Sequence, residues 1–175
     1  MIFNPGVCVS EIEDGLDVDR VFPAHTTTVS IFGKDPQTDP QWIHQRVSIQ
    51  PQESTVFPQE RVGEILSCWV SLYDRPRDVD QVARWMGLDE LLLRKAAKSS
   101  GGRLQRLNVG LSIIGRAKPA ILDGPSTGLD VMVRDDLWRV LRFLVEEGTT
   151  IIVLSTHDLD EARVLCHEIA VIDRG

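Results

Sequence analysis

The sequence predicts an α/β protein in which a mostly parallel sheet carries a helical subdomain. Over the last third of the chain, short apolar strands at 120–122, 150–154 and 169–172 alternate with helical segments. Parallel neighbouring strands need a crossover between them, and helices supply it, so this alternation indicates a parallel sheet. From about residue 60 to 115, apolar residues instead follow the helical period throughout, which predicts a helical part.

Composition narrows the class of protein. The chain has 175 residues, 42% of them apolar, and a formal net charge of −7. A chain of this size and apolar content can bury a core as one domain. Broad binding to nucleic acid works through lysine and arginine, so the acidic balance argues against a nucleic-acid partner. The longest apolar runs, such as residues 151–154, fall far short of the ~20 residues that a membrane span needs.

Two further features favour a cytoplasmic protein. The first ten residues contain no Lys or Arg and are interrupted by Asn4-Pro5, unlike a secretory signal. The three cysteines, Cys8, Cys68 and Cys166, lack metal-ligand spacing. We therefore expect reduced thiols and neither a zinc site nor a disulfide framework.

The chain divides into a short unassigned segment, 1–22, and a domain, 23–175. The first segment holds five carboxylates and one base without a helical or alternating pattern, so we expect it to be poorly ordered or an eroded phosphate-loop region. Two short strands follow, around 29–31 and 47–49, with a turn signal at 33–36 between them.

Three helices are expected in the middle stretch, the second ending at Gly87 and the third following Gly101-Gly102. The apolar residues expected on their buried faces are Ile65, Leu66, Trp69, Leu72 and Tyr73, then Val79, Val82 and Met86, then Leu104, Leu107, Leu111 and Ile114. The expected core of the central strands consists of Ile121, Leu122, Ile152 and Val153.

A carboxylate and an imidazole follow two of the predicted strands. Asp123 ends one strand and His157 comes just after the next. In open parallel sheets, ligands bind beyond the carboxyl ends of the strands, so these side chains would meet at one edge. Taken alone, the pair is ambiguous, because an Asp at a strand end is usually a turn or cap residue and such a His usually lies on the surface.

The surrounding segments give the pair a context. Residues 99–107 read SSGGRLQRL, residues 123–130 read DGPSTGLD, and residues 154–162 read LSTHDLDEA. In this order and spacing they resemble the ATP-binding subunit of ABC transporters, in particular bacterial drug exporters of the daunorubicin-resistance type. The resemblance covers about residues 23–175 and implies a partial P-loop NTPase fold, truncated at its amino end.

The resemblance implies a role for each motif. Ser100, Gly101 and Gly102 match the signature motif, and Ser126 to Asp130 match the D-loop. Asp123 matches the Walker B carboxylate that holds Mg²⁺, and Gln52 matches the Q-loop glutamine, a catalytic residue that is also a ligand of Mg²⁺. His157 matches the switch histidine, which contacts the terminal phosphate of ATP. A helix amino end suits an anion, and carboxylate and amide oxygens suit Mg²⁺. As isolated matches, residues 99–102 would be only a cap and loop, and Gln52 an ordinary loop residue.

Two features of the family are missing. The chain has no Gly-Lys-Ser or Gly-Lys-Thr run, the Walker A phosphate loop, and its only Gly-Lys pair is Gly33-Lys34. Counting back from Pro23, that loop should begin near Asn4, with its lysine near Ser10. Gly124 stands where the family has the glutamate that polarises the attacking water. Holding phosphate and activating water are therefore both expected to be impaired.

Three functional hypotheses follow. The chain is the ATP-binding subunit of a drug or multidrug exporter that is defective alone, or a non-enzymatic partner that completes the composite site of an intact ATPase subunit, or a decayed gene product. Whether it is an ATPase stays open at this point. The resemblance implies ATP and Mg²⁺ as cofactors, a transmembrane permease and a second nucleotide-binding subunit (in a homo- or heterodimer) as partners, and a location at the inner face of the plasma membrane.

Overall fold

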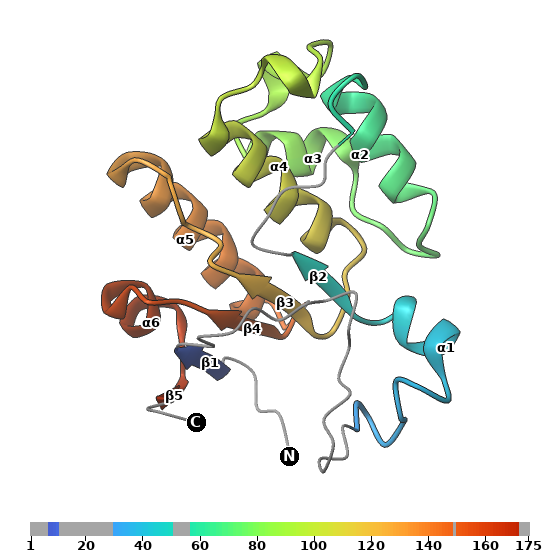
Figure 1. Ribbon diagram of the computed structural model, residues 1–175, viewed down its shortest axis with the longest axis vertical. Helices are drawn as coiled ribbons and strands as arrows, with labels where there is room; N and C mark the ends of the chain where they lie inside the picture. The colour runs from blue at the N-terminus through green and yellow to red at the C-terminus, as the bar shows by residue number, and fades with distance from the viewer. Residues whose placement is uncertain (1–6, 11–29, 51–56, 149, 172–175) are drawn as a thin grey trace.

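Five parallel strands form one sheet in the computed structural model, which describes residues 7–10, 30–50, 57–148 and 150–171. The strands stand in the order β2-β3-β4-β1-β5 (Figure 1). Their bounds are β1 (Val7–Ser10), β2 (Ser48–Gln50), β3 (Ala120–Asp123), β4 (Ile152–Ser155) and β5 (Glu168–Val171). The predicted parallel sheet is confirmed, and its pairing brings the carboxyl ends of the strands to one edge.

β1 lies inside the sheet, where it pairs with β4 on one side and β5 on the other. We expected no regular element within residues 1–22 and placed a phosphate loop near Asn4 to Ser10, and both expectations are wrong for residues 7–10. The rest of 1–22 lies outside the described residues. A phosphate loop follows a strand and leads into a helix, so the position for one in this sheet comes after Ser10.

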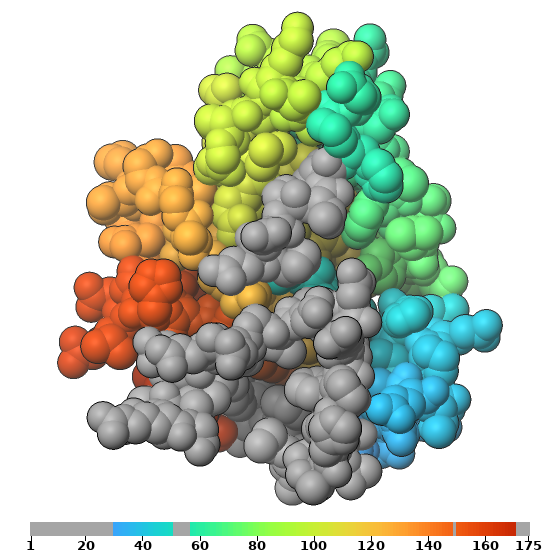
Figure 2. Space-filling view, viewed as in Figure 1, coloured from blue at the N-terminus to red at the C-terminus, as the bar shows by residue number. Residues whose placement is uncertain are grey.

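The helices α5 (Val131–Glu146) and α6 (Leu159–Leu165) supply the crossovers from β3 to β4 and from β4 to β5. The helical part consists of α2 (Val62–Val70), α3 (Val79–Trp85) and α4 (Gly101–Ile114), with the short 3-10 helices η2 (Asp89–Leu91) and η3 (Ala96–Lys98) between α3 and α4. Figure 2 shows this part, in green and yellow, as a lobe that extends beyond the orange and red atoms of α5 and α6. All three predicted helices are present.

α4 is the central helix of the core, because it packs against α2 and α3 as well as β2 and β3. Its expected buried residues Leu107, Leu111 and Ile114 are buried, and Leu104 is half-buried. Burial also extends around the helix to Ile113, since α4 has protein on both sides. A single apolar face therefore underestimates how much of α4 is covered.

Several local expectations differ from the structure. Ile31 forms only an isolated bridge with Lys34, whereas Val29 lies outside the described residues. Leu72 comes after the end of α2 and is 61% exposed. Ile121 and Val153 are half-buried, because alternate residues of β3 and β4 point to the less covered face of the sheet.

One helix and one disulfide bond were not expected from the sequence. A short helix, α1 (Pro40–His44), precedes β2 and begins with a proline, which is favourable in the first turn. Cys166 is disulfide-bonded, so the expectation of reduced thiols is wrong there, while Cys68 is free and exposed.

Arg77 joins the helical part to the amino edge of the sheet. The side chain is 3% exposed, and its guanidinium donates to the Ile113 carbonyl oxygen and, at 3.1 Å, to Thr150 Oγ1. Burial, and then the charge of Arg116, lower the pKa of Arg77 to about 10, whereas Glu147 acts in the opposite direction. A buried cation with fixed acceptors thus holds the two parts together.

Candidate nucleotide-binding edge

Three strand ends meet at the carboxyl edge of the sheet. Asp123 is paired in register with Ser155, and the Ser155 hydroxyl donates a hydrogen bond to Asp123 Oδ1. Gln50, at the end of β2, is buried, and its Nε2 donates to the backbone oxygen of Asp123 at 3.1 Å. The half-buried Asp123 carboxylate is therefore held at the edge where the sequence placed it.

The loop 124–130 leads from β3 to α5 and is anchored by α4. Gly124 has a φ of +54°, in the left-handed region that favours glycine. Gln105 of α4 donates its Nε2 to the carbonyl oxygens of Gly124 at 2.9 Å and Pro125 at 3.2 Å. The residue after Asp123 thus has a fixed backbone but no side chain with which to orient water.

The predicted signature residues form the amino end of α4, which is 14 residues long. Ser100 and Gly101 are exposed and Gly102 is half-buried. A Cβ on Gly102 would lie 3.3 Å from Leu129 Cδ2, so this helix end touches the loop 124–130. The Ser100 side chain makes no capping hydrogen bond, and the first N–H groups of a helix have no partner within it. This end can therefore bind an anion.

Asp130 has a structural role in addition to the one predicted. Its Oδ1 accepts a hydrogen bond from the Val133 N–H at 3.1 Å, so it is the N-cap of α5. It also lies near Arg106 of α4. Burial and then Arg103 lower the pKa of Arg106, and the carboxylates of Asp130 and Asp136 oppose that shift. The end of the loop is therefore coupled to α4 electrostatically.

His157 follows β4 and is exposed, and it makes no hydrogen bond or ion pair within the described part of the chain. Both of its neighbours are anchored. Thr156 Oγ1 accepts from the Asp158 N–H at 3.0 Å, and Asp158 caps α6 by accepting from Asp160 N–H at 2.8 Å. Asp158 also forms a 2.9 Å ion pair with Arg134 of α5. The imidazole is thus presented from a fixed loop.

The structure places most of the predicted site residues at one edge. Asp123 is the last residue of β3, His157 comes just after the neighbouring β4, and Gly102 touches the loop that ends at Asp130. Gln52 lies outside the described residues. The roles that the family resemblance implies for these residues remain predictions.

Sequence reasoning missed three residues that position the edge: Gln105, Arg134 and Ser155. Ser155 is the last residue of an expected strand, which could have identified it. Gln105 and Arg134 carried no such signal, because each contacts a segment about 20 residues or more away in the sequence.

The oxygen atoms of Asp123 and Ser155 fit Mg²⁺ only if the phosphates of a bound nucleotide supply further ligands. Asp123 and Ser155 offer hard oxygen atoms, but no group of three or more His, Cys, Asp or Glu side chains gathers within the described residues. Mg²⁺ is usually held by one or two carboxylates plus substrate phosphates. For ATP, the amino end of α4 fits an anion, whereas the sequence lacks the Gly-Lys-Ser/Thr loop that would enclose the phosphates.

A parallel sheet with crossover helices, a helical part, and motif residues at the carboxyl edge together define a nucleotide-binding domain of the P-loop NTPase class. Residues 20–127 match the profile of the ABC transporter family, more than half of the chain, so this chain belongs to the ABC transporter family. Among the described residues, the structure has no helix with the length and apolarity needed to cross a membrane.

Relatives include bacterial resistance proteins. The daunorubicin/doxorubicin resistance ATP-binding protein DrrA of Streptomyces peucetius is 35% identical over 153 residues, covering 85% of this chain and 46% of DrrA. The linearmycin resistance ATP-binding protein LnrL of Bacillus subtilis is 30% identical over 136 residues, covering 75% of this chain and 43% of LnrL. The retinal-specific phospholipid-transporting ATPase ABCA4 of Bos taurus is 32% identical over 89% of this chain but only 7% of its own length. The chain spans less than half of each of these relatives.

Two solved structures confirm the predicted fold. The dimeric ATP-binding cassette MJ0796, in a post-hydrolysis state bound to ADP and Pi, superposes with a TM-score of 0.81, covering 97% of this chain and 81% of its own at 16% identity. An ATP-binding subunit of an ABC transporter gives a TM-score of 0.79 at 18% identity, covering 95% and 74%. At these identities they show the fold alone.

Proposed function

We propose that this chain is the ATP-binding subunit of a drug-exporting ABC transporter and that it does not hydrolyse ATP by itself. Its similarity to DrrA and LnrL supports the exporter type. The observation that carries the second part is Gly124, whose backbone is fixed at φ +54° directly after Asp123 and offers no carboxylate to water. General-base groups contribute about 10²–10⁴ in rate, so their absence leaves hydrolysis near background.

A composite role is the second candidate, and the exposed end of α4 favours it. A Cβ on Gly101 would have no atom within 4 Å, so the surface around it is open to a partner. In this role Ser100 and Gly101 face the nucleotide of an intact ATPase subunit, while the chain hydrolyses nothing. Both roles place the chain beside a transmembrane permease at the inner face of the membrane.

Several residues of this chain hold Asp123 and His157 in position. Ser155 and Gln50 hold Asp123, whose carboxylate would bind Mg²⁺ through water, and Gln105 holds the loop that follows. Asp158 and Thr156 fix the loop from which His157 would contact a terminal phosphate. Mg²⁺, when bound, would neutralise phosphate charge beside Asp123.

Nucleotide binding to the isolated chain tests whether it is defective by itself, as the first candidate proposes. We expect a dissociation constant for MgATP no tighter than about 1 mM by calorimetry, because the sequence has no phosphate loop. A low-micromolar constant would contradict this.

Mixing experiments test the second candidate. The chain is combined with DrrA, and MgATP hydrolysis is measured as phosphate release. A composite site predicts an activity above that of DrrA alone, which Gly101→Asp abolishes by placing a carboxylate against the anion. Ser67→Asp, which adds the same charge on an exposed face of α2, is the matched control. No stimulation, or equal loss in both variants, would leave the decayed-product hypothesis as the better account.

A further inference from the structure

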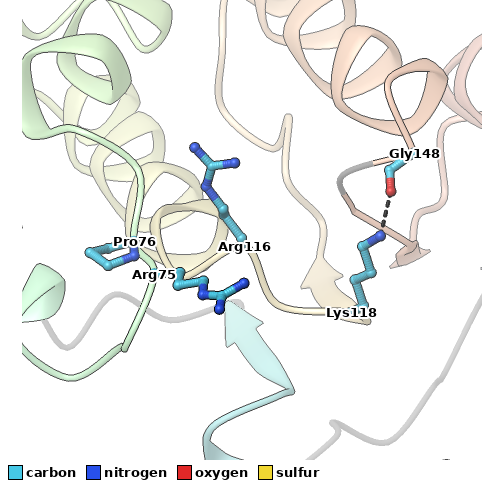
Figure 3. A pocket seen from close by; sticks show the side chains of 5 residues that line it. All are labelled: Arg75, Pro76, Arg116, Lys118 and Gly148. Atoms are coloured by element: carbon cyan, nitrogen blue, oxygen red, sulfur yellow. Dashed lines mark hydrogen bonds between the residues drawn. The ribbon is translucent and has the colours of Figure 1, made fainter.

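A cationic cavity lies at the amino edge of the sheet, opposite the candidate nucleotide edge. It is lined by Arg75, Pro76, Arg116, Lys118 and Gly148 and has a volume of about 530 Å³ (Figure 3). The cavity is largely open to solvent, so a ligand would lie against its charged side chains rather than be enclosed by them. Three of its five lining residues are cations, although the whole chain has a net charge of −7.

A second cavity of about 480 Å³ adjoins the first. It shares Arg116 and Lys118 with the first cavity and adds Arg46 and an aromatic wall formed by Phe32 and Trp42. The two rings meet edge to face, with centroids 6.3 Å apart. We call the two cavities together the cationic groove, defined by Arg46, Arg75, Arg116 and Lys118 and by the wall of Phe32 and Trp42.

The charges of the groove are not neutralised by carboxylates. Within the described ranges, none of its four cations forms an ion pair. Lys118 Nζ donates to the Gly148 carbonyl oxygen, and the Arg46 guanidinium lies 4.2 Å from the centroid of the Trp42 ring. Glu147 raises the pKa of the neighbouring Arg77, whereas Arg116 lowers it.

The backbone around the cationic groove is held in a specific conformation. Arg116 has a φ of +53°, a conformation that is costly for a residue with a side chain and that concentrates at functional sites. The Lys118 N–H donates to the Arg46 carbonyl oxygen at 2.8 Å, which fixes the two cavities relative to one another. Arg75 and Arg116 lie on one side of the first cavity and Lys118 on the other (Figure 3).

We propose that the cationic groove binds a phosphate-bearing anion. Guanidinium groups match phosphate oxygens bidentately, and a lysine adds a point charge across the cavity. The wall of Phe32 and Trp42 would take an apolar or flat group next to the phosphate. This site is separate from the nucleotide edge, since the length of β3 puts about 10 Å between the two edges.

The phosphate can come from a soluble compound or from the headgroup of a membrane lipid. Titrations with pyrophosphate and phenyl phosphate, followed by NMR shifts of backbone and indole N–H groups, test the soluble source. Flotation with phosphatidylcholine vesicles, with and without phosphatidic acid, tests the lipid source. Binding in either arm supports the proposal, and the arm that responds identifies the source.

Substitutions in the groove test whether the anion binds there. Arg116→Gly removes a cation and suits the local backbone, so the fold should survive, and Arg75→Gln removes a second cation. Each should weaken binding about tenfold, equivalent to about 1.4 kcal/mol. Arg163→Gln, at an exposed position of α6, changes the net charge equally and should leave the affinity unchanged. Trp42→Leu removes one ring of the wall and should weaken the binding of phenyl phosphate more than the binding of pyrophosphate.

Three results would overturn the proposal. These are an absence of saturable binding in both arms, an equal loss of affinity in Arg163→Gln, and shifts confined to Gly101 and Gly102. The last result would place the anion at the end of α4 and would support the composite role instead. Failure of the groove is thus distinguishable from failure of the proposed function.

Discussion

The helical part and the carboxyl edge of the sheet differ in what each needs from outside the chain. In the helical part, Leu66, Leu107 and Ile114 are at most 1% exposed, and Gly115 leaves room for the Tyr73 ring. At the carboxyl edge and at the amino end of α4 that adjoins it, by contrast, Ser100, Gly101 and His157 are exposed. The side chains of the first region are thus covered by the chain itself, whereas those of the second are exposed and would need a ligand or a partner to contact.

This difference teaches that folding and chemical competence are separable in this chain. Burial is distributed over many side chains, so the core can form without any one motif. Catalysis depends on a few groups that act together, so under the proposed function the missing Gly-Lys-Ser/Thr run and the missing carboxylate at position 124 would be enough to abolish hydrolysis. The following changes test each side of this comparison.

Restoring both missing groups should have the largest effect. Because β1 already lies between β4 and β5, a family-type phosphate loop is grafted in place of residues 11–22 and combined with Gly124→Glu. The graft alone should restore MgATP binding with slow turnover, and Gly124→Glu alone should stay at background. Together they should raise turnover about 100-fold or more over the graft alone.

Non-additivity is the signature of that experiment. His157→Ala in the doubly changed protein should abolish most of the phosphate release. Robust hydrolysis by the unmodified, pure chain would refute the account based on two missing groups.

Core truncations should be next in size. Leu111→Ala in the helical part and Ile152→Ala in the sheet each remove a buried side chain, and each should lower the free energy of unfolding by about 2–5 kcal/mol. Leu93→Ala, at a position that is 81% exposed, should change it by less than about 0.5 kcal/mol. Urea denaturation measures all three. A small effect at Leu111 alone would show that the helical part is less complete than its packing indicates.

Two glycine substitutions compare a packed position of the helical part with an open position at the end of α4. In Gly115→Ala, the new Cβ would overlap the Tyr73 ring, which should cost about 1–3 kcal/mol. Gly101→Ala at the open end of α4 meets no atom within 4 Å and should be close to neutral. Thermal unfolding compares the two variants, and equal stabilities would contradict the packing argument.

Gly124→Ala should have a somewhat smaller effect on stability. A left-handed backbone costs an L-residue about 1–2 kcal/mol, and the Cβ would approach Thr127 Oγ1 to 2.7 Å. Gly128→Ala has a similar φ of +73° but open space, so the difference between the variants isolates the contact with Thr127. Chemical denaturation measures that difference, and its absence would show that Thr127 turns aside freely.

The ion pair between Arg134 and Asp158 should contribute least. Both side chains are about 30% exposed, so a double-mutant cycle with Arg134→Met and Asp158→Asn should give a coupling of about 0.2–1 kcal/mol. Added salt should reduce it. A coupling well above this range would mean that the loop carrying His157 depends on α5 more strongly than the geometry indicates.

The sequence by itself determined the alternation of strands and helices from β3 to β5, the three helices of the middle stretch, and the positions of the motifs. These features follow from local signals: apolar periodicity marks a helix or strand, and glycine and proline mark where it ends. Gly87, for example, ends α3 with a φ of +58°, as its position after Met86 predicted.

Tertiary structure alone decided β1, whose four residues are too few to show a pattern. Its pairing with β4 and β5 depends on strands more than 140 residues away. The same holds for the burial of α4 on both sides, because the second side is set by β2 and β3.

The site divides in the same way. Local patterns indicated Asp123 at the end of one strand and His157 just after the next, but not the Ser155 hydroxyl that holds Asp123 from a position 32 residues away. The cationic groove likewise draws Arg46, Arg75 and Arg116 from three separate segments. Local patterns specify which elements form, whereas contacts between elements depend on how the sheet and α4 bring distant residues together.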